Sequence, residues 1–281
     1  MSRIIRENNL QTKKNLQLER CKNIDEDTIC SLYKNGKTIK EISNLLDVST
    51  IVIKSRLIKN NIKIRDNSSS HKKYKEDESY FNIINTNDKA YFLGFICADG
   101  WLTNQGCLGI EVSKKDSEII YWAKEQLQSD RPIYEKENSI GIQIHSKKIF
   151  DTLCSYSIIP NKSLSLDISK VIELANISEE YIPSFLLGYF DGDGGIYKTK
   201  THNTYYQYSC SITGTKETCS YFYLFFGENG FENKRHKDNK NNTTLQIGGR
   251  NQCKKALSKI YQNINDLSFY FKRKYNLYCE L

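Results

Sequence analysis

Two short segments of this chain follow one pattern, although they lie far apart in the sequence. The first is "FLGFICADGW" at positions 92–101, and the second is "LLGYFDGDGG" at positions 186–195. Each is an apolar run of helical character that ends in an aspartate followed by a glycine. Because Asp99 and Asp193 occupy equivalent positions, the chain is expected to hold two copies of one structural unit.

The residues after each segment support this internal repeat. Strands are predicted where apolar and polar residues alternate, and helices where apolar residues recur at helical spacing. In the first copy, strands are expected at 107–114, 132–136 and 139–146, with helices at 116–128 and 147–156. In the second copy, strands are expected at 205–213, near 231–237 and at 243–249, with helices at 216–226 and 251–263 and a last segment at 269–275. The predicted fold class is α+β, with two pseudo-symmetric αββαββα repeats.

Five parts are predicted along the chain. They are a basic tail or helix at 1–22, a small all-α domain at 23–65, a linker at 66–85, the first repeat at 86–172 and the second repeat at 173–281. The linker is predicted from the polar stretch "DNSSSHKKYKEDES", whose one apolar side chain is Tyr74.

The small domain carries three short helical patterns. Two of them are joined by a tight turn around Val48, and Ser49 can cap the third helix. This spacing predicts a helix-turn-helix and resembles the DNA-binding unit of resolvases and of many phage regulators. The expected DNA contacts are Ser49, Thr50, Lys54, Ser55 and Arg56. The alternative interpretation is a plain three-helix bundle.

Composition restricts the class of protein without identifying it. The chain has 281 residues, and its 41 Lys and Arg against 33 Asp and Glu give a net charge of +8, which suits a polyanionic partner. Nine scattered cysteines without a CxxC pair argue against a zinc site and a disulfide framework. No apolar run reaches membrane-spanning length. We expect an intracellular protein, in the cytoplasm or nucleoid of a bacterial or phage-infected cell or in an organelle matrix.

Small residues within the two motifs predict how the motif helices pack. Gly94 and Ala98 are four residues apart, as are Gly188 and Gly192, so each pair lies on one helix face. Small residues on a shared face let two helix backbones approach closely. The two motif helices are therefore expected to pack side by side, which would bring the two aspartates together at one end.

This placement of two aspartates is electrostatically unfavourable without a counter-charge. A carboxylate at a helix C-terminus costs about 0.3–1 kcal/mol, and a second carboxylate nearby adds repulsion. A divalent cation would compensate, and oxygen ligands alone favour Mg²⁺. Gly100 and Gly194 are expected to end the helices with positive φ. The alternatives are that each aspartate and glycine form only a turn, or that residues 191–202 form a calcium loop, which lacks the required ligands.

The two motifs resemble those of LAGLIDADG homing endonucleases, and the resemblance extends over roughly residues 86–281. The resemblance implies a saddle of strands on duplex DNA, and metal binding by Asp99 and Asp193. It also implies that Asp191, replaced by Cys97 in the first motif, is not catalytic. Finally, it implies catalytic roles for Lys114 and for the late lysines Lys162 and Lys274. Gly214 stands where the second repeat would match Lys114.

Strand parity independently predicts a polar sheet face. In the first repeat Gln143 and His145 face away from the isoleucines of their strand. The corresponding residues of the second repeat are Gln207, Ser209, Ser211 and Gln246. Uncharged polar side chains of this kind can contact base edges in the major groove. A merely solvated sheet face is the alternative.

Together with the resemblance, these features predict a site-specific endonuclease that uses Mg²⁺ to hydrolyse double-stranded DNA. The resemblance further implies a break with short 3′ overhangs. Two motifs in one chain predict a monomer. Two alternatives stay open: a DNA-binding transcription regulator of the same fold that does not cleave, and a maturase that binds its host intron RNA.

Overall fold

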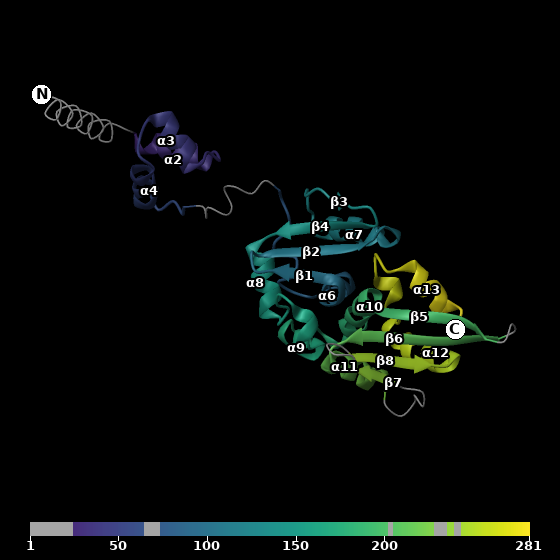
Figure 1. Cartoon of the computed structure of the whole chain (residues 1–281). Helices are drawn as coiled ribbons and strands as arrows, with labels where there is room; N and C mark the ends of the chain where they lie inside the picture. Colours follow the sequence, from purple (N-terminus) through teal and green to yellow (C-terminus); the bar gives the residue numbers. More distant parts are fainter. Residues whose placement is uncertain (1–24, 65–73, 202–204, 228–234, 239–242) are drawn as a thin grey trace, which may run out of the picture. The chain divides into compact units, whose positions relative to one another are not determined.

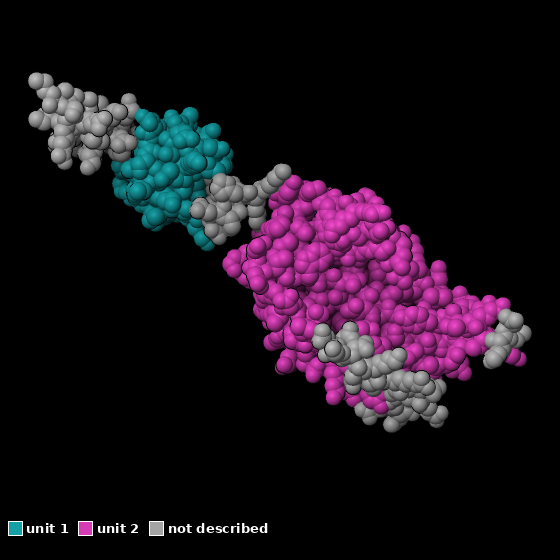
Figure 2. All heavy atoms as spheres, in the orientation of Figure 1, with its two compact units in different colours: residues 1–73 teal, residues 74–281 magenta. Residues whose placement is uncertain are grey.

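The structure is a computed structural model that describes residues 25–64, 74–201, 205–227, 235–238 and 243–281. The chain forms two compact units, residues 1–73 and residues 74–281, which are coloured separately in Figure 2. Among the described residues, no helix combines the length and the hydropathy that crossing a membrane requires.

The first unit contains three described helices: α2 (Glu26–Lys34), α3 (Ile39–Leu46) and α4 (Thr50–Lys59). A capping box between Thr38 and Glu41 fixes the start of α3, and Asp47 ends it in the left-handed conformation with a φ of 52°. Ser49 caps α4 by accepting a hydrogen bond from the Ile51 amide at 3.2 Å. The apolar faces of the helices meet in a small core of Ile29, Cys30, Tyr33, Ile42, Val48, Ile53 and Leu57.

The second unit contains both predicted repeats in the predicted order. The first repeat runs α6 (Asn87–Asp99), β1 (Gly100–Thr103), β2 (Cys107–Ser113), α7 (Glu118–Gln126), β3 (Tyr134–Glu135), β4 (Ser139–His145) and α8 (Lys147–Ser155). The second runs α10 (Ile182–Asp193), β5 (Gly194–Thr201), β6 (Tyr205–Gly214), α11 (Lys216–Phe226), β7 (Arg235–Asp238), β8 (Thr243–Gly248) and α12 (Arg250–Ile260). The predicted fold of two αββαββα repeats is therefore confirmed.

Each repeat forms one antiparallel four-stranded sheet, and the two sheets have the same strand order. The order is β1-β2-β4-β3 in the first repeat and β5-β6-β8-β7 in the second. Helices α6 and α10 pack against each other between the two sheets (Figure 1). The core is continuous through both repeats, so the two halves of this unit fold as one body.

Two of the described α-helices of the second unit lie outside the repeated pattern. Helix α9 (Ile168–Leu174) follows the first repeat, so the predicted repeat boundary at residues 172 and 173 falls inside a helix. Helix α13 (Lys272–Cys279) occupies the place of the last predicted segment, shifted toward the C-terminus. Both follow irregular segments that return to the motif helices, where Lys162 and Phe271 form hydrogen bonds with Ala98 and Asp191.

Residues 74–85, the described part of the linker expected at 66–85, belong to the second unit. The rest of that linker and the basic tail or helix expected at 1–22 lie outside the described residues. Within residues 74–85, Tyr80, Phe81 and Ile84 are buried in the core of the second unit. Arg131 holds the start of this segment through a 3.0 Å ion pair with Glu76. The three apolar residues have a helical spacing of three and four residues, but the segment forms turns and bends, and the predicted linker included it.

Candidate metal and nucleic-acid site

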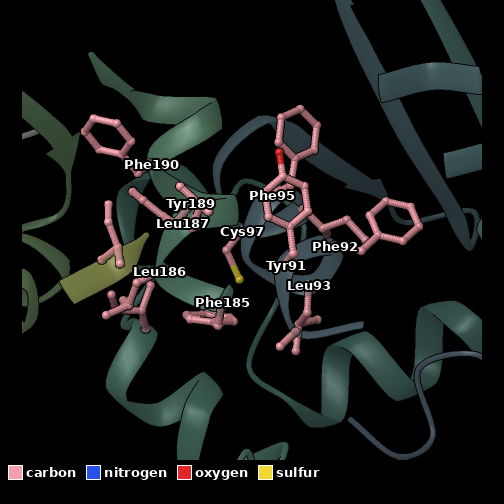
Figure 3. Packing of buried hydrophobic residues seen from close by; sticks show 14 of the residues in the cluster. Tyr91, Phe92, Leu93, Phe95, Cys97, Phe185, Leu186, Leu187, Tyr189 and Phe190 are labelled. Atoms are coloured by element: carbon pink, nitrogen blue, oxygen red, sulfur yellow. The ribbon is translucent and has the colours of Figure 1, made fainter. Parts of the chain in front are cut away.

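The two motif helices approach each other closely at their glycines. A Cβ atom at Gly94 would lie 1.9 Å from the carbonyl oxygen of Phe185, and one at Gly188 would lie 1.9 Å from that of Tyr91. The two contacts are equivalent, as expected for a pseudo-twofold axis between the repeats. Figure 3 shows the buried side chains of α6 and α10 that surround this helix pair. A further turn along, a Cβ at Gly192 would meet the Cβ of Ala98 at 2.4 Å, so all four predicted small residues lie in the interface.

The glycines that follow the motifs have a different role from the one expected. Gly100 has a φ of −76° and Gly194 a φ of −107°, so the predicted positive φ is wrong for both. Crowding explains the glycines instead. A Cβ at Gly100 would lie 2.8 Å from the Ile96 carbonyl oxygen, and one at Gly194 would lie 2.2 Å from the Phe190 ring. The chain therefore passes from each helix directly into a strand, without a left-handed turn.

Asp99 and Asp193 end α6 and α10 at the same end of the helix pair. A Cβ at Gly192 would lie 3.4 Å from the carboxyl carbon of Asp99, which places this carboxylate beside the last turn of α10. Loss of water raises the pKa of Asp99. For Asp193, loss of water and then the negative charge of Asp99 raise the pKa to about 6. The two acids are thus close enough to repel each other.

The late lysines Lys162 and Lys274 are buried near these acids. Lys162 donates a hydrogen bond to the carbonyl oxygen of Ala98 at 2.8 Å, at the end of α6. Lys274 donates to the carbonyl oxygens of Phe190, Asp191 and Gly194, at 2.8, 2.7 and 2.7 Å. Burial lowers the pKa of Lys274 to about 8, so its ammonium is still charged at neutral pH. Both lysines place positive charge at helix C-termini, where it is favoured.

Lys114 lies apart from this buried group. It begins a 3₁₀ turn, Lys114–Asp116, that follows β2. Its side chain is about half exposed and pairs with Glu135 at 3.4 Å. The structure therefore places Lys114 just after the end of the inner strand β2, paired with an acid of β3 rather than grouped with the buried lysines.

Asp191 has a structural environment that links the two repeats. It is buried and accepts hydrogen bonds from the Tyr91 hydroxyl at 2.7 Å and from the Phe271 amide at 3.0 Å. Burial raises its pKa to about 6. Because both donors come from outside its own helix, Asp191 joins α6 and the C-terminal segment to α10.

In the second repeat, the sheet face away from the core is polar along its length. It carries Tyr197 and Thr199 of β5, Gln207, Ser209, Ser211 and Thr213 of β6, and Thr244 and Gln246 of β8. Gln207 is exposed, and Ser209 and Gln246 are partly exposed. Ser211 departs from expectation because it is buried, with its hydroxyl 3.4 Å from that of Tyr197.

In the first repeat, the corresponding face carries aromatic rings that the sequence pattern did not identify. Gln143 and His145 are exposed on β4 as predicted from parity. A Cβ at Gly109 would lie 2.2 Å from the indole of Trp101, so this ring lies against the glycine. Tyr134 lies against Gly141 in the same way, because a Cβ at Gly141 would lie 2.5 Å from the Tyr134 hydroxyl. Glycine opposite an aromatic residue is the signal that could have revealed these rings, but it requires the strand register.

An acidic group also lies on this face of the first sheet. Glu111 accepts hydrogen bonds from Lys136 at 2.8 Å, from Tyr134 at 3.0 Å and from Ser139 at 2.5 Å. These hydrogen bonds lower the pKa of Glu111 to about 2. A fixed carboxylate here restricts which groups of a polyanionic ligand can approach.

In the helical unit, four of the five predicted DNA contacts are exposed. They are Ser49, Thr50, Lys54 and Ser55. Arg56 is turned toward α2, where it forms an ion pair with Glu26. Lys59 and Asn60 also bind Glu26, at 3.1 and 3.0 Å. Arg56 therefore has an acidic partner within the unit and is less exposed than the other four predicted contacts.

The donor groups at the ends of α6 and α10 suit a hard divalent cation. Among the described residues, no group of three or more His, Cys, Asp and Glu side chains could hold a metal ion. Mg²⁺ is commonly bound by one or two carboxylates together with water and substrate phosphates. Asp99 and Asp193 match this requirement, because a cation would offset the loss of water and the repulsion from Asp99, which raise the pKa of Asp193.

Comparison with known proteins gives one family match and several similar solved structures. Residues 170–261 match the family model described as a LAGLIDADG-like domain, which confirms the resemblance in the second repeat. The chain is also similar to the solved structure of the meganuclease I-SmaMI bound to uncleavable DNA, with 14% identity over 68% of this chain and 88% of that one and a TM-score of 0.48. The LAGLIDADG meganucleases I-CpaMI and I-AabMI, both bound to uncleaved DNA, have identities of 13% and 16%, each over 68% of this chain and over 89% and 88% of their own, with TM-scores of 0.48 and 0.45. The comparison with curated proteins gave no match.

Proposed function

We propose that this protein is a site-specific endonuclease that hydrolyses both strands of duplex DNA with Mg²⁺. The observation that carries this proposal is the pair of carboxylates, Asp99 and Asp193, at one end of two closely packed helices. Binding without cleavage would not require two mutually repelling acids at this position. Their cost in stability is explained if both bind metal in the active protein.

The residues of the chain would act together on the DNA backbone. Asp99 and Asp193 would each hold a divalent cation beside one scissile phosphate. Such a cation lowers the pKa of a bound water and stabilises charge on the phosphate in the transition state. The positive charges of Lys162 and Lys274 oppose the repulsion between the acids, since both lower the pKa of Asp193. One chain supplies both acids, so the active form is proposed to be a monomer.

The two polar sheet faces would contact base edges in the major groove. Gln207, Ser209 and Gln246 in the second repeat, with Gln143 and His145 in the first, provide donors and acceptors for this purpose. The α4 residues Ser49, Thr50, Lys54 and Ser55 would add contacts through the helical unit and so lengthen the recognised site. Affinity should fall steeply with salt, because many phosphates would be neutralised.

The test is cleavage of a plasmid that carries the uninterrupted DNA flanking this gene. Purified protein with Mg²⁺ is expected to linearise the plasmid, while Asp99→Asn and Asp193→Asn bind the DNA with unchanged affinity and do not linearise it. Specific binding by the wild type with intact DNA at every divalent cation tested would reject the nuclease and favour a regulator. Specific binding to the intron transcript alone would favour a maturase.

A further inference from the structure

The two buried lysines differ in the number of hydrogen bonds that they can still form. An ammonium group has three N–H donors. Lys274 uses all three, on the carbonyl oxygens of Phe190, Asp191 and Gly194. This lysine therefore caps the end of α10 and has no donor left for a phosphate or a water.

Lys162 has a different environment, although it occupies the equivalent place in the first repeat. Among the described residues, its one hydrogen-bond acceptor is the carbonyl oxygen of Ala98, at 2.8 Å. Two of its three donors are therefore available. Lys162 also lines a cavity of about 210 Å³, and Asp193, Thr213 and Gly214 line the same cavity.

This cavity has room for a phosphate group and water beside Asp193, because one water takes up about 30 Å³. Gly214 contributes no side chain to it. Donors directed at developing negative charge are among the largest contributions to catalysis, and they act only if they are not already used. The Asp193 side thus combines an acid, an available ammonium and open space.

The Asp99 side is built differently. Of the two lysines, Lys274 lowers the pKa of Asp99 more, and all three of its donors are occupied. The neighbouring Arg273 is also engaged, because it binds the carboxylate of Asp116 at 2.7 and 3.0 Å. The positive groups on this side are therefore held by the protein itself.

We propose that the two centres are unequal: Lys162 is a catalytic residue that donates to the scissile phosphate at the Asp193 centre, whereas Lys274 is a positioning residue that holds the end of α10. The strand at the Asp193 centre is therefore cut first, and a nicked intermediate accumulates. This inference rests on the proposed nuclease function.

The experiment follows each strand separately. A supercoiled plasmid carrying the flanking DNA shows nicked and linear products, and duplexes labelled on one strand or the other give the two rates. The variants are Lys162→Met, Lys274→Met and, as a matched control, Lys170→Met on the exposed side of α9. Thermal melting and DNA affinity are measured for each variant, so that folding and binding defects are separated from loss of chemistry.

The wild type is expected to cut one strand about 10-fold or more faster than the other. Lys162→Met should slow the faster strand by about 100-fold, the cost of losing one transition-state donor, and leave the slower strand within about 3-fold. Its melting temperature should stay close to that of the wild type. Lys274→Met should lower the melting temperature and slow both strands alike, and Lys170→Met should resemble the wild type.

Two results would overturn the inference alone: equal strand rates in the wild type, or a Lys162→Met variant that slows both strands equally. These measurements decide the matter even if Lys274→Met does not fold. Absence of all cleavage by a protein that binds the DNA would instead reject the proposed function, and the inference with it.

Discussion

Replacing Asp193 with asparagine is expected to stabilise the metal-free protein, although it removes a group from the proposed site. The surroundings raise the pKa of Asp193 from 3.8 to about 6, first by removing water and then through the charge of Asp99. The folded protein therefore holds this proton more tightly than the unfolded chain does. Above the folded pKa, the ionised carboxylate opposes folding.

The expected size follows from this shift. A pKa raised from 3.8 to about 6 corresponds to about 3 kcal/mol of unfavourable free energy when the carboxylate is ionised. The side chain reaches solvent, so screening reduces the effect, and we expect a gain of about 1 kcal/mol. For a unit of about 200 residues, this raises the melting temperature by about 2–4 °C.

The pH dependence has a defined sign. Because the folded pKa is raised, the penalty is present above pH 6 and disappears as the pH falls toward the unfolded value near 4. Calorimetry in EDTA should show the full advantage of Asp193→Asn at about pH 7.5 and only a small one at about pH 4.5. Glu173→Gln, an exposed change on α9, serves as the control. An asparagine variant less stable than the wild type at about pH 7.5, or an advantage that does not change with pH, would refute the reasoning.

Three further predictions concern packing and DNA contacts. Gly188→Ala should destabilise the second unit by about 3 kcal/mol in denaturant titrations, because its Cβ meets the backbone of α6. Gly195→Ala, whose Cβ meets a tyrosine ring that can rotate, should cost about 1 kcal/mol or less, and equal costs would contradict the helix contact. Glu111→Gln should strengthen DNA binding several-fold and steepen the salt dependence by about one phosphate contact, since it frees a lysine; unchanged affinity would place DNA elsewhere. In the helical unit, Lys54→Ala should weaken DNA binding, whereas Arg56→Ala should mainly lower the melting temperature; the reverse pattern would show that Arg56 leaves its partner for DNA.

The helix pair could be predicted from the sequence because its determinants are local. Gly94 and Gly188 sit four residues before Ala98 and Gly192, and this spacing alone places small residues on one face. The order of strands and helices followed from periodicity in the same way. Both kinds of information are contained in short windows of the chain.

Other features required contacts between distant residues. The carbonyl partners of Lys274 come from residues about 80 positions earlier, brought together by an irregular segment with no period. The burial of Ser211 depends on Tyr197 in the neighbouring strand, and the partner of Arg56 lies on another helix. The role of Gly100 was mistaken because a glycine at a helix end suggests a left-handed turn, whereas crowding against Ile96 accounts for it here.

The most direct test of the whole account is anomalous diffraction from crystals of the full chain bound to its DNA site in the presence of Mn²⁺. We predict metal peaks within coordination distance of the Asp99 and Asp193 carboxylates, each also contacting a backbone phosphate. Peaks absent from both carboxylates, or DNA bound on a surface away from the ends of α6 and α10, would contradict it.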